Sequence, residues 1–331
     1  MSLLTFQASV EEEKIKEKYD LVIVGAGPAG CSAAIYARRF ELETLIVAKE
    51  LGGLIVDAEI VDNYPALPEI PGSQLGNKFL EHAKKYMTNI LMGEVENIEK
   101  KDSSFLVKTV DGRTLEAKAV ILATGEKHRK LNVPGEEELL GRGVSYCGIC
   151  DAPLFKNRVV AVVGGGNVAF SDAQLLAKHA KKVILIHRRN WFRADPIEVK
   201  RVKENSKIEI LTPYIVREIK GDMKVEKLLL EKTKEVGGEV IPTGELKEIE
   251  VDGIFVDIGL VPNSELAEKS GVEVDERGYI IVDNFMRTSV EGIFAAGDVT
   301  DKGSKFRQVV LAAAQGAIAA ISVYNYLRSK E

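Results

Sequence analysis

Two glycine-rich segments of the same kind constrain the fold of this chain more than any other feature. The first, residues 25–30 (GAGPAG), directly follows an apolar run over residues 20–24. The second, residues 164–169 (GGGNVA), directly follows an apolar run over residues 158–163. A strand, a glycine loop and a helix in this order open a dinucleotide-binding βαβ unit, in which the helix N-terminus faces a pyrophosphate. We therefore expect two such units, each with room for one dinucleotide.

Both segments continue as a βαβ unit requires. After the first loop we predict a helix over residues 31–40 and a strand over residues 44–47. After the second loop we predict a helix over residues 169–179 and a strand over residues 182–186. The fold class is therefore α/β, with an architecture that is duplicated within the chain.

The segments around the second unit indicate how the two units are joined. Residues 106–123 alternate in polarity around the Asp111-Gly112 turn and predict a hairpin. Residues 128–138 and 253–262 are candidate hinges. Beyond them we predict short strands over 279–282 and 293–296 and an Ala-rich helix over 309–327. Because this last segment has no glycine fingerprint, it completes the first unit, and the second unit is an insertion.

The composition excludes several classes of partner. The net charge of -5 and the pI near 5.7 disfavour nucleic acid and anionic membranes as main partners. We expect no apolar stretch of the ~20 residues that a membrane span needs. Residues 1–10 lack a basic region followed by an apolar run, so we expect no secretory signal and a cytoplasmic protein.

The three cysteines of the chain indicate what chemistry it performs. Cys31 lies on the opening turn of a predicted helix, and we interpret it as a small packed residue. Cys147 and Cys150 form CGIC, followed directly by Asp151. The four histidines are scattered and complete no metal site, so we expect no metal and a redox dithiol. A dithiol between two dinucleotide sites suggests an electron relay from nicotinamide to flavin to disulfide.

At this level of detail the chain resembles the low-molecular-weight thioredoxin reductases, which are FAD-containing pyridine nucleotide-disulfide oxidoreductases. The resemblance extends from about Tyr19 to Leu327. It rests on GAGPAG at 25–30, GG at 52–53, DNYP at 62–65, ATG at 123–125, SYCGICD at 145–151, GGGN at 164–167, HRRxxFR at 187–193, AAGD at 295–298 and RQ at 307–308.

The resemblance implies a domain organisation and a set of partners. It implies two Rossmann-like, three-layer ββα domains, with an NADPH domain (132–259) inserted into a discontinuous FAD domain (1–131 and 260–331). It further implies a homodimer that reduces thioredoxin or a glutaredoxin-like protein disulfide oxidoreductase.

The site residues of the first domain are expected from the fingerprint and from the resemblance. Glu50, near the end of the second strand, is a candidate for the ribose hydroxyls or else an exposed loop carboxylate. Where the family generally has Gln after the glycine pair, this chain has Leu54. The full expected FAD set is Gly25, Gly27, Pro28, Ala29, Gly30, Glu50, Gly52, Gly53, Leu54, Asn63, Ala123, Thr124, Gly125, Gly297, Asp298, Arg307 and Gln308.

In the second domain the arginines indicate a nucleotide preference. Guanidinium groups after the second strand suit a 2′-phosphate, so we expect NADPH. Val168 stands where the family commonly has a hydroxyl residue, which leaves room for weaker binding or another electron donor. The full expected set is Gly164, Gly166, Asn167, Val168, His187, Arg188, Arg189, Arg193 and Ile258.

The resemblance also gives the three catalytic residues separate roles. Cys150 lies against the flavin, Cys147 attacks the substrate disulfide, and Asp151 is the acid-base candidate or, alternatively, a helix or turn cap. Rotation of the second domain about the hinges brings the dithiol in turn to the flavin and to the protein substrate. The alternative function is a flavin disulfide reductase of the same fold that uses ferredoxin, a deazaflavin or NADH. The intact CGICD motif argues against a non-catalytic relative.

Overall fold

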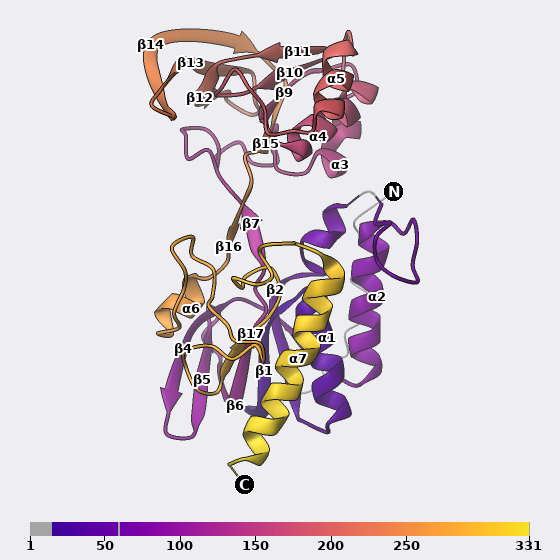
Figure 1. Cartoon of the computed structure of the whole chain (residues 1–331), viewed down its shortest axis with the longest axis vertical. Helices are drawn as coiled ribbons and strands as arrows, with labels where there is room; N and C mark the ends of the chain where they lie inside the picture. The colour runs from indigo at the N-terminus through magenta and orange to yellow at the C-terminus, as the bar shows by residue number, and fades with distance from the viewer. Residues whose placement is uncertain (1–14, 59, 331) are drawn as a thin grey trace. The chain divides into compact units, whose positions relative to one another are not determined.

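The computed structural model of the chain describes residues 15–58 and 60–330. Residues 1–10, in which we expect no secretory signal, lie outside them. The chain forms two compact units, one up to Lys127 and from Pro262 on, the other over His128–Val261 (Figure 1). The second unit is thus inserted in the first. The boundaries predicted from the sequence, after residues 131 and 259, differ from these by a few residues.

In the first unit, over the described residues, a seven-stranded sheet has the order β3-β2-β1-β6-β5-β4, and β17 pairs with β6. Pairing is parallel among β3, β2, β1, β6 and β17 and antiparallel along β4, β5 and β6. The strands are β1 (Lys18–Ala26), β2 (Thr44–Leu51), β3 (Asn89–Met92), β4 (Val95–Lys101), β5 (Ser104–Thr109), β6 (Thr114–Leu122) and β17 (Ile293–Ala295). The predicted hairpin is therefore confirmed as β5 and β6.

Two helices from opposite ends of the chain pack together on this sheet. They are α1 and α7, and their residues share one core with β1, β2 and β6 (Figure 1). Close approach is possible because Gly316 of α7 faces α1, where a Cβ would lie 2.0 Å from the Ala29 carbonyl oxygen. The helices are α1 (Pro28–Arg39), the 3-10 helix η1 (Gly53–Asp57), α2 (Gly72–Lys85), α6 (Glu265–Lys269) and α7 (Val309–Arg328).

Helix α7 corrects one expectation from the sequence. Among the described residues it is the one helix whose length and hydropathy would allow it to cross a membrane, so the expectation that no stretch does so is wrong. Its composition has another physical cause. Ala312, Ala319 and Ala320 are buried against the first unit, and such a contact selects small apolar residues.

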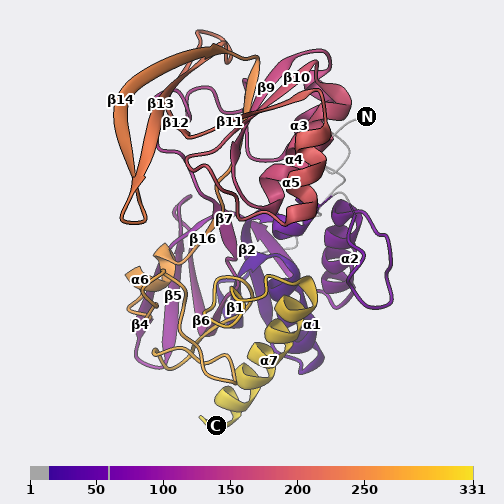
Figure 2. The same ribbon diagram turned by 45° about the horizontal axis from the view of Figure 1, so that its top comes forward.

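The inserted unit has three layers. A five-stranded parallel sheet in the order β11-β10-β9-β15-β8 lies between helices α3–α5 and the antiparallel sheet β12-β13-β14 (Figure 2). Alternate side chains of β9 serve the two cores, because Val160 and Val162 pack with α4 while Ala161 and Val163 pack with β12 and β13. The three-layer ββα prediction is confirmed for this unit.

The elements of the inserted unit have the following bounds. The strands are β8 (Val144–Ser145), β9 (Val159–Gly164), β10 (Lys182–Ile186), β11 (Ile208–Leu211), β12 (Tyr214–Lys220), β13 (Lys227–Val236), β14 (Glu239–Glu250) and β15 (Gly253–Asp257). The helices are α3 (Gly148–Asp151), the 3-10 helix η2 (Ala152–Phe155), α4 (Asn167–His179) and α5 (Pro196–Glu204).

Two sequence predictions are wrong in this part of the chain. The candidate hinge over 253–262 includes β15, a buried central strand, so only the residues after Asp257 remain as a connection. The chain passes between the units in β7 (Glu126–His128) and β16 (Leu260–Pro262), which pair with each other. Residues 279–282 form no strand, because Ile280 makes only isolated bridges.

Candidate dithiol and dinucleotide sites

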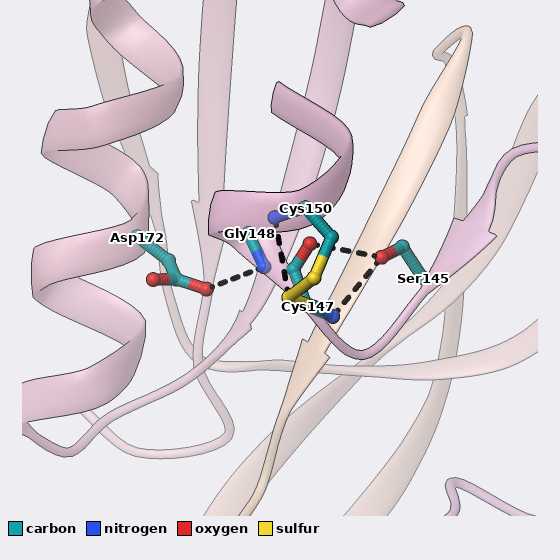
Figure 3. The surroundings of a disulfide bond; sticks show 5 residues. All are labelled: Ser145, Cys147, Gly148, Cys150 and Asp172. Carbon is teal, nitrogen blue, oxygen red and sulfur yellow. Dashed lines mark hydrogen bonds between the residues drawn. A yellow bond between two sulfur atoms is a disulfide. The ribbon is translucent and has the colours of Figure 1, made fainter. Parts of the chain in front are cut away.

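The CGIC motif forms a disulfide at the start of a one-turn helix. Cys147 and Cys150 are joined, with their Cα atoms 5.4 Å apart (Figure 3). Cys147 is the N-cap of α3, and its sulfur accepts a hydrogen bond from the Cys150 N–H at 3.2 Å. Cys147 is half-buried and Cys150 is exposed. The two residues of the disulfide therefore differ in exposure.

Two side chains from other elements hold this turn. The Ser145 hydroxyl accepts from the Cys147 N–H at 3.0 Å and donates to the Cys147 carbonyl at 3.2 Å. From α4, Asp172 accepts a hydrogen bond from the Gly148 N–H at 3.1 Å (Figure 3). A Cβ on Gly148 would lie 2.2 Å from the Asp172 carboxylate, so only glycine allows this approach. Ser145 belongs to the SYCGICD motif at 145–151, whereas Asp172 lies outside the CGIC motif and was not predicted as part of this site.

Asp172 has a second buried carboxyl group near it. Burial raises the pKa of Asp172, which the Gly148 N–H and His128 oppose. Burial and then the Asp172 charge raise the pKa of Asp257, at the end of β15, well above its usual value. Within residues 15–58 and 60–330, the buried Oδ2 of Asp257 has no hydrogen-bond partner. The two carboxyl groups therefore destabilise each other when both are ionised.

This pair predicts how stability depends on pH. The pKa of Asp257 is higher in the folded protein than in the unfolded chain, so the folded protein is favoured when this carboxyl is protonated. This stabilisation is fully present below about pH 3.9 and is lost as the pH rises through the pKa that Asp257 has in the folded protein. Asp257→Asn should raise the free energy of unfolding at pH 7 and weaken its dependence on pH, because asparagine carries no charge to bury. Urea unfolding between pH 4 and pH 8 measures it. The exposed Asp222→Asn is the control, and an unchanged pH dependence in Asp257→Asn would contradict the prediction.

Asp151 ends the dithiol helix. Its backbone N–H donates to the Cys147 carbonyl at 3.3 Å, and its side chain is half-buried. Its carboxylate makes no capping hydrogen bond to the following 3-10 helix η2 within the described part of the chain. The alternative interpretation of Asp151 as a cap of that helix thus loses its basis, while its role in proton transfer stays a prediction.

In the first unit each fingerprint glycine has a different neighbour. Gly25 has φ +111°, and a Cβ there would lie 2.2 Å from the Ala123 carbonyl oxygen. A Cβ on Gly30 would lie 2.0 Å from the Gly25 carbonyl oxygen, which explains the close packing of α1 on β1. Gly27 is the N-cap of α1, where no side chain caps the helix among the described residues, and Pro28 takes the first helical position. The helix N-terminus is thus bare, as a pyrophosphate requires.

The expected residues around this helix lie together. Gly53 faces Gly27, with a Cβ on Gly53 placed 3.1 Å from the Gly27 Cα, and a Cβ on Gly297 would touch the Ala29 Cβ at 3.0 Å. The buried Gln315 of α7, which the sequence analysis missed, accepts from the Gly297 N–H at 2.8 Å. Gly52 begins the loop with φ +86°.

Two further expected residues meet directly. The Asn63 amide donates to the Gln308 side-chain oxygen at 2.9 Å, although the two are far apart in the sequence. Thr124 and Gly125 are joined to Asn263 by three hydrogen bonds of 2.7 to 3.0 Å. Leu54 is half-buried in η1, and Glu50 is exposed within β2, which extends beyond the predicted 44–47. The role of Glu50 therefore stays a prediction.

Arg307 has a protein partner that the sequence analysis did not anticipate. The buried Glu126 accepts hydrogen bonds of 2.9 to 3.0 Å from its guanidinium and one of 2.6 Å from the Tyr279 hydroxyl. These bonds raise the pKa of Arg307. Burial, and next the charge of Glu126, raise the pKa of Asp298 to about 6, against the opposing effect of Arg307. Arg307 thus already forms an ion pair with Glu126. Any contact of Arg307 with a flavin would form in addition to this ion pair.

In the inserted unit the second fingerprint has the same construction. A Cβ on Gly164 would lie 2.5 Å from the Asp257 carbonyl oxygen, and Gly166 is the N-cap of α4 with open space where a Cβ would be. Asn167 exchanges hydrogen bonds with Asp195, at 2.7 Å to its N–H and 3.1 Å to its carboxylate. Val168 is 65% exposed, and Ile258 is half-buried against the core.

The HRRxxFR segment adjoins this loop. A Cβ on Gly165 would lie 2.3 Å from the His187 ring, and the Arg193 N–H donates to the Gly165 carbonyl at 2.8 Å. Burial, and then the charges of Arg188 and Arg189, lower the pKa of His187 to about 4, so its imidazole is neutral at pH 7. The structure thus places the His187 ring and the Arg193 backbone against the glycine loop, while the role of the arginine side chains stays a prediction.

Comparison with known proteins agrees with this geometry. Residues 19–316 match the family described as pyridine nucleotide-disulphide oxidoreductase. The chain belongs to this family. A thioredoxin reductase of Bacillus subtilis is 41% identical over 320 residues, which are 96% of this chain and 96% of that protein.

Solved structures related to this pyridine nucleotide-disulphide oxidoreductase show the same fold. The Lactococcus lactis thioredoxin reductase in its FR conformation has a TM-score of 0.81 and 37% identity, covering 94% of this chain and 99% of that one. The T. acidophilum thioredoxin reductase has a TM-score of 0.79 and 39% identity, covering 96% of this chain and 100% of that one. Membership of the family implies use of a flavin and a pyridine nucleotide with a disulfide.

Proposed function

We propose that this protein is a thioredoxin-disulfide reductase that uses NADPH and FAD. Its substrate is thioredoxin or a glutaredoxin-like protein disulfide oxidoreductase, and it acts as a cytoplasmic homodimer. Residues 1–131 and 260–331 bind FAD, and residues 132–259 bind NADPH. The observation that carries the proposal is the Cys147–Cys150 disulfide at the start of α3, within a unit that also has a dinucleotide fingerprint. The relatives named thioredoxin reductase, which cover nearly the whole chain, support it.

The first unit fits a flavin dinucleotide. Gly27 leaves the N-terminus of α1 open to a pyrophosphate, and Asn63 and Gln308 together offer amide groups to a polar ring. When bound, a flavin accepts a hydride from a reduced nicotinamide and passes the electron pair to a disulfide. Because the fingerprint of the first βαβ unit is built for an adenosine diphosphate moiety, FAD fits and FMN does not.

The second unit fits a nucleotide with a 2′-phosphate. In the described part of the chain, the buried Nε of Arg189 has no hydrogen-bond partner, and its nearest anionic group is a Glu235 carboxylate oxygen at 3.9 Å. Burial, and then the charges of Arg189, Arg193 and Arg129, lower the pKa of Arg188. Such crowding of positive charge favours a ligand that carries negative charge.

The dithiol then reduces the protein substrate in two exchanges. After reduction, the Cys147 thiolate attacks one sulfur of the substrate disulfide, and the other substrate sulfur leaves as a thiolate. The Cys150 thiolate attacks the Cys147 sulfur of this mixed disulfide, which restores Cys147–Cys150 and releases the second substrate sulfur. Asp151 supplies or accepts the protons that the thiols exchange. Two electrons thus pass from the dithiol to the substrate.

The proposal is tested by rapid mixing of the purified protein with each electron donor. NADPH should bleach the flavin absorbance faster than NADH at equal concentration, and added thioredoxin disulfide should restore the absorbance. If ferredoxin or a deazaflavin reduces the flavin and neither NADPH nor NADH does, the NADPH assignment is wrong and the alternative function holds. Release of FMN in place of FAD would refute the cofactor assignment.

A substitution in the arginine segment tests the nucleotide assignment. Arg188→Ala together with Arg189→Ala should raise the KM for NADPH at least about tenfold and leave that for NADH nearly unchanged, since each charge-assisted hydrogen bond contributes roughly 1.5–3 kcal/mol. Steady-state kinetics measure both constants. Arg201→Ala is the matched control, because Arg201 is an exposed arginine paired with Glu198 on α5. Equal effects on both nucleotides would show that the two arginines do not recognise the 2′-phosphate.

A further inference from the structure

The guanidinium group proposed for the 2′-phosphate already has a carboxylate beside it. The Arg189 Nε lies 3.9 Å from a carboxylate oxygen of Glu235, close enough for an ion pair but too far for a hydrogen bond. The Arg189 Nη2 reaches the Gly238 carbonyl only at 3.5 Å. Arg189 is thus held loosely by the chain itself, and the side chain is only 14% exposed.

Trp191 completes this arrangement. The Arg189 guanidinium lies over its indole ring, 5.1 Å from the ring centroid. The indole N–H donates to the other carboxylate oxygen of Glu235 at 3.1 Å. Glu235 therefore has a fixed orientation, with one oxygen toward Trp191 and the other toward Arg189.

The hairpin that carries Glu235 is anchored to the arginine segment. Glu235 is the second-last residue of β13. One residue, Val236, separates it from the turn to β14, which Gly237 and Gly238 make with φ +60° and +86°. The Thr233 hydroxyl, on the same strand, donates to the Arg188 carbonyl at 2.8 Å. The strand is thus tied to the arginine segment, and the carboxylate itself is held by the Trp191 N–H.

We propose that Glu235 determines how strongly the protein distinguishes nucleotides with a 2′-phosphate from those with a 2′-hydroxyl. This inference rests on the proposed function of the arginine segment. A carboxylate and a phosphate compete for one guanidinium group and repel each other at short range. A ribose 2′-hydroxyl, by contrast, can donate a hydrogen bond to a carboxylate. Glu235 therefore lowers the affinity for NADPH relative to NADH.

The test uses Glu235→Gln in the full-length protein. Glutamine keeps an oxygen that accepts from Trp191 but removes the charge. Calorimetry compares adenosine 2′,5′-bisphosphate with adenosine 5′-monophosphate, two probes that differ only in the 2′-phosphate. The variant should bind the bisphosphate about fivefold to tenfold more tightly, with the monophosphate unchanged or weaker. Trp191 is the one tryptophan of the sequence, so its fluorescence provides a second measure of binding.

Two further variants distinguish a failure of the role of Glu235 from a failure of the nucleotide assignment. Glu239→Gln, on the other side of the same turn, is the matched control and should change neither affinity. If Arg189→Ala weakens the bisphosphate and Glu235→Gln leaves the ratio of affinities unchanged, the role of Glu235 is refuted and the arginine assignment stands. If Arg189→Ala affects both probes equally, the proposed nucleotide assignment fails and the role of Glu235 fails with it.

Discussion

Cys150→Ser is expected to reduce the rate of thioredoxin-disulfide reduction by about 10³-fold or more. The remaining Cys147 thiol attacks the substrate disulfide, but no second thiol resolves the mixed disulfide. The variant should therefore accumulate a covalent complex with thioredoxin. Gel electrophoresis without reductant measures the complex, and its disappearance on adding dithiothreitol confirms that a disulfide holds it.

Two other cysteine variants show whether the inner and outer roles are assigned correctly. Cys147→Ser should lose the same activity but form no such complex, since the attacking sulfur is missing. Cys31→Ser should behave like the unaltered protein, because Cys31 is fully buried in α1 and burial raises the pKa of its thiol to about 12. A covalent complex that forms in Cys147→Ser and not in Cys150→Ser would mean that the two roles are reversed.

Local patterns in the sequence predicted most of the parallel sheets. The strand over 182–186 and the helix starting at Val309 agree with β10 and α7, because both have strong and continuous apolar patterns. The wrong strand over 279–282 had the same kind of apolar pattern, but its Ile280 is buried through isolated bridges to Val274 and Thr300. A short apolar run shows that a segment is buried but not that it pairs along its length. The layer β12-β13-β14 was expected only from the resemblance, and its strands were not predicted individually, since no glycine fingerprint marks them.

The candidate sites show the same limit of local information. The glycines and arginines were predicted because each motif is contiguous, and the Arg193 N–H donates to the Gly165 carbonyl between two of these motifs. Glu126, Asp172 and Glu235 were missed because their partners are distant in the sequence: Arg307 follows Glu126 by 181 residues. A single acidic residue on a strand or helix has no pattern that indicates which cation or N–H it will meet.

Gly25→Ala is expected to unfold or strongly destabilise the first unit, by about 2–4 kcal/mol. Gly25 has φ +111°, which alanine rarely adopts, and the new Cβ would lie 2.2 Å from the Ala123 carbonyl oxygen. Because that oxygen belongs to the backbone after β6, the clash cannot be relieved by turning a side chain. Thermal unfolding should show a lower melting temperature, and the purified protein should hold little flavin.

Gly27→Ala should separate flavin binding from folding. The Gly27 φ of -79° suits alanine, and the new Cβ would have only an ordinary contact, 3.7 Å from the Gly53 Cα. The melting temperature of the flavin-free protein should therefore stay close to that of the unaltered protein. The methyl group would stand at the bare N-terminus of α1, where a pyrophosphate must approach the backbone, so the Kd for FAD should rise at least about tenfold. If Gly27→Ala binds FAD normally, the pyrophosphate does not lie at this helix terminus.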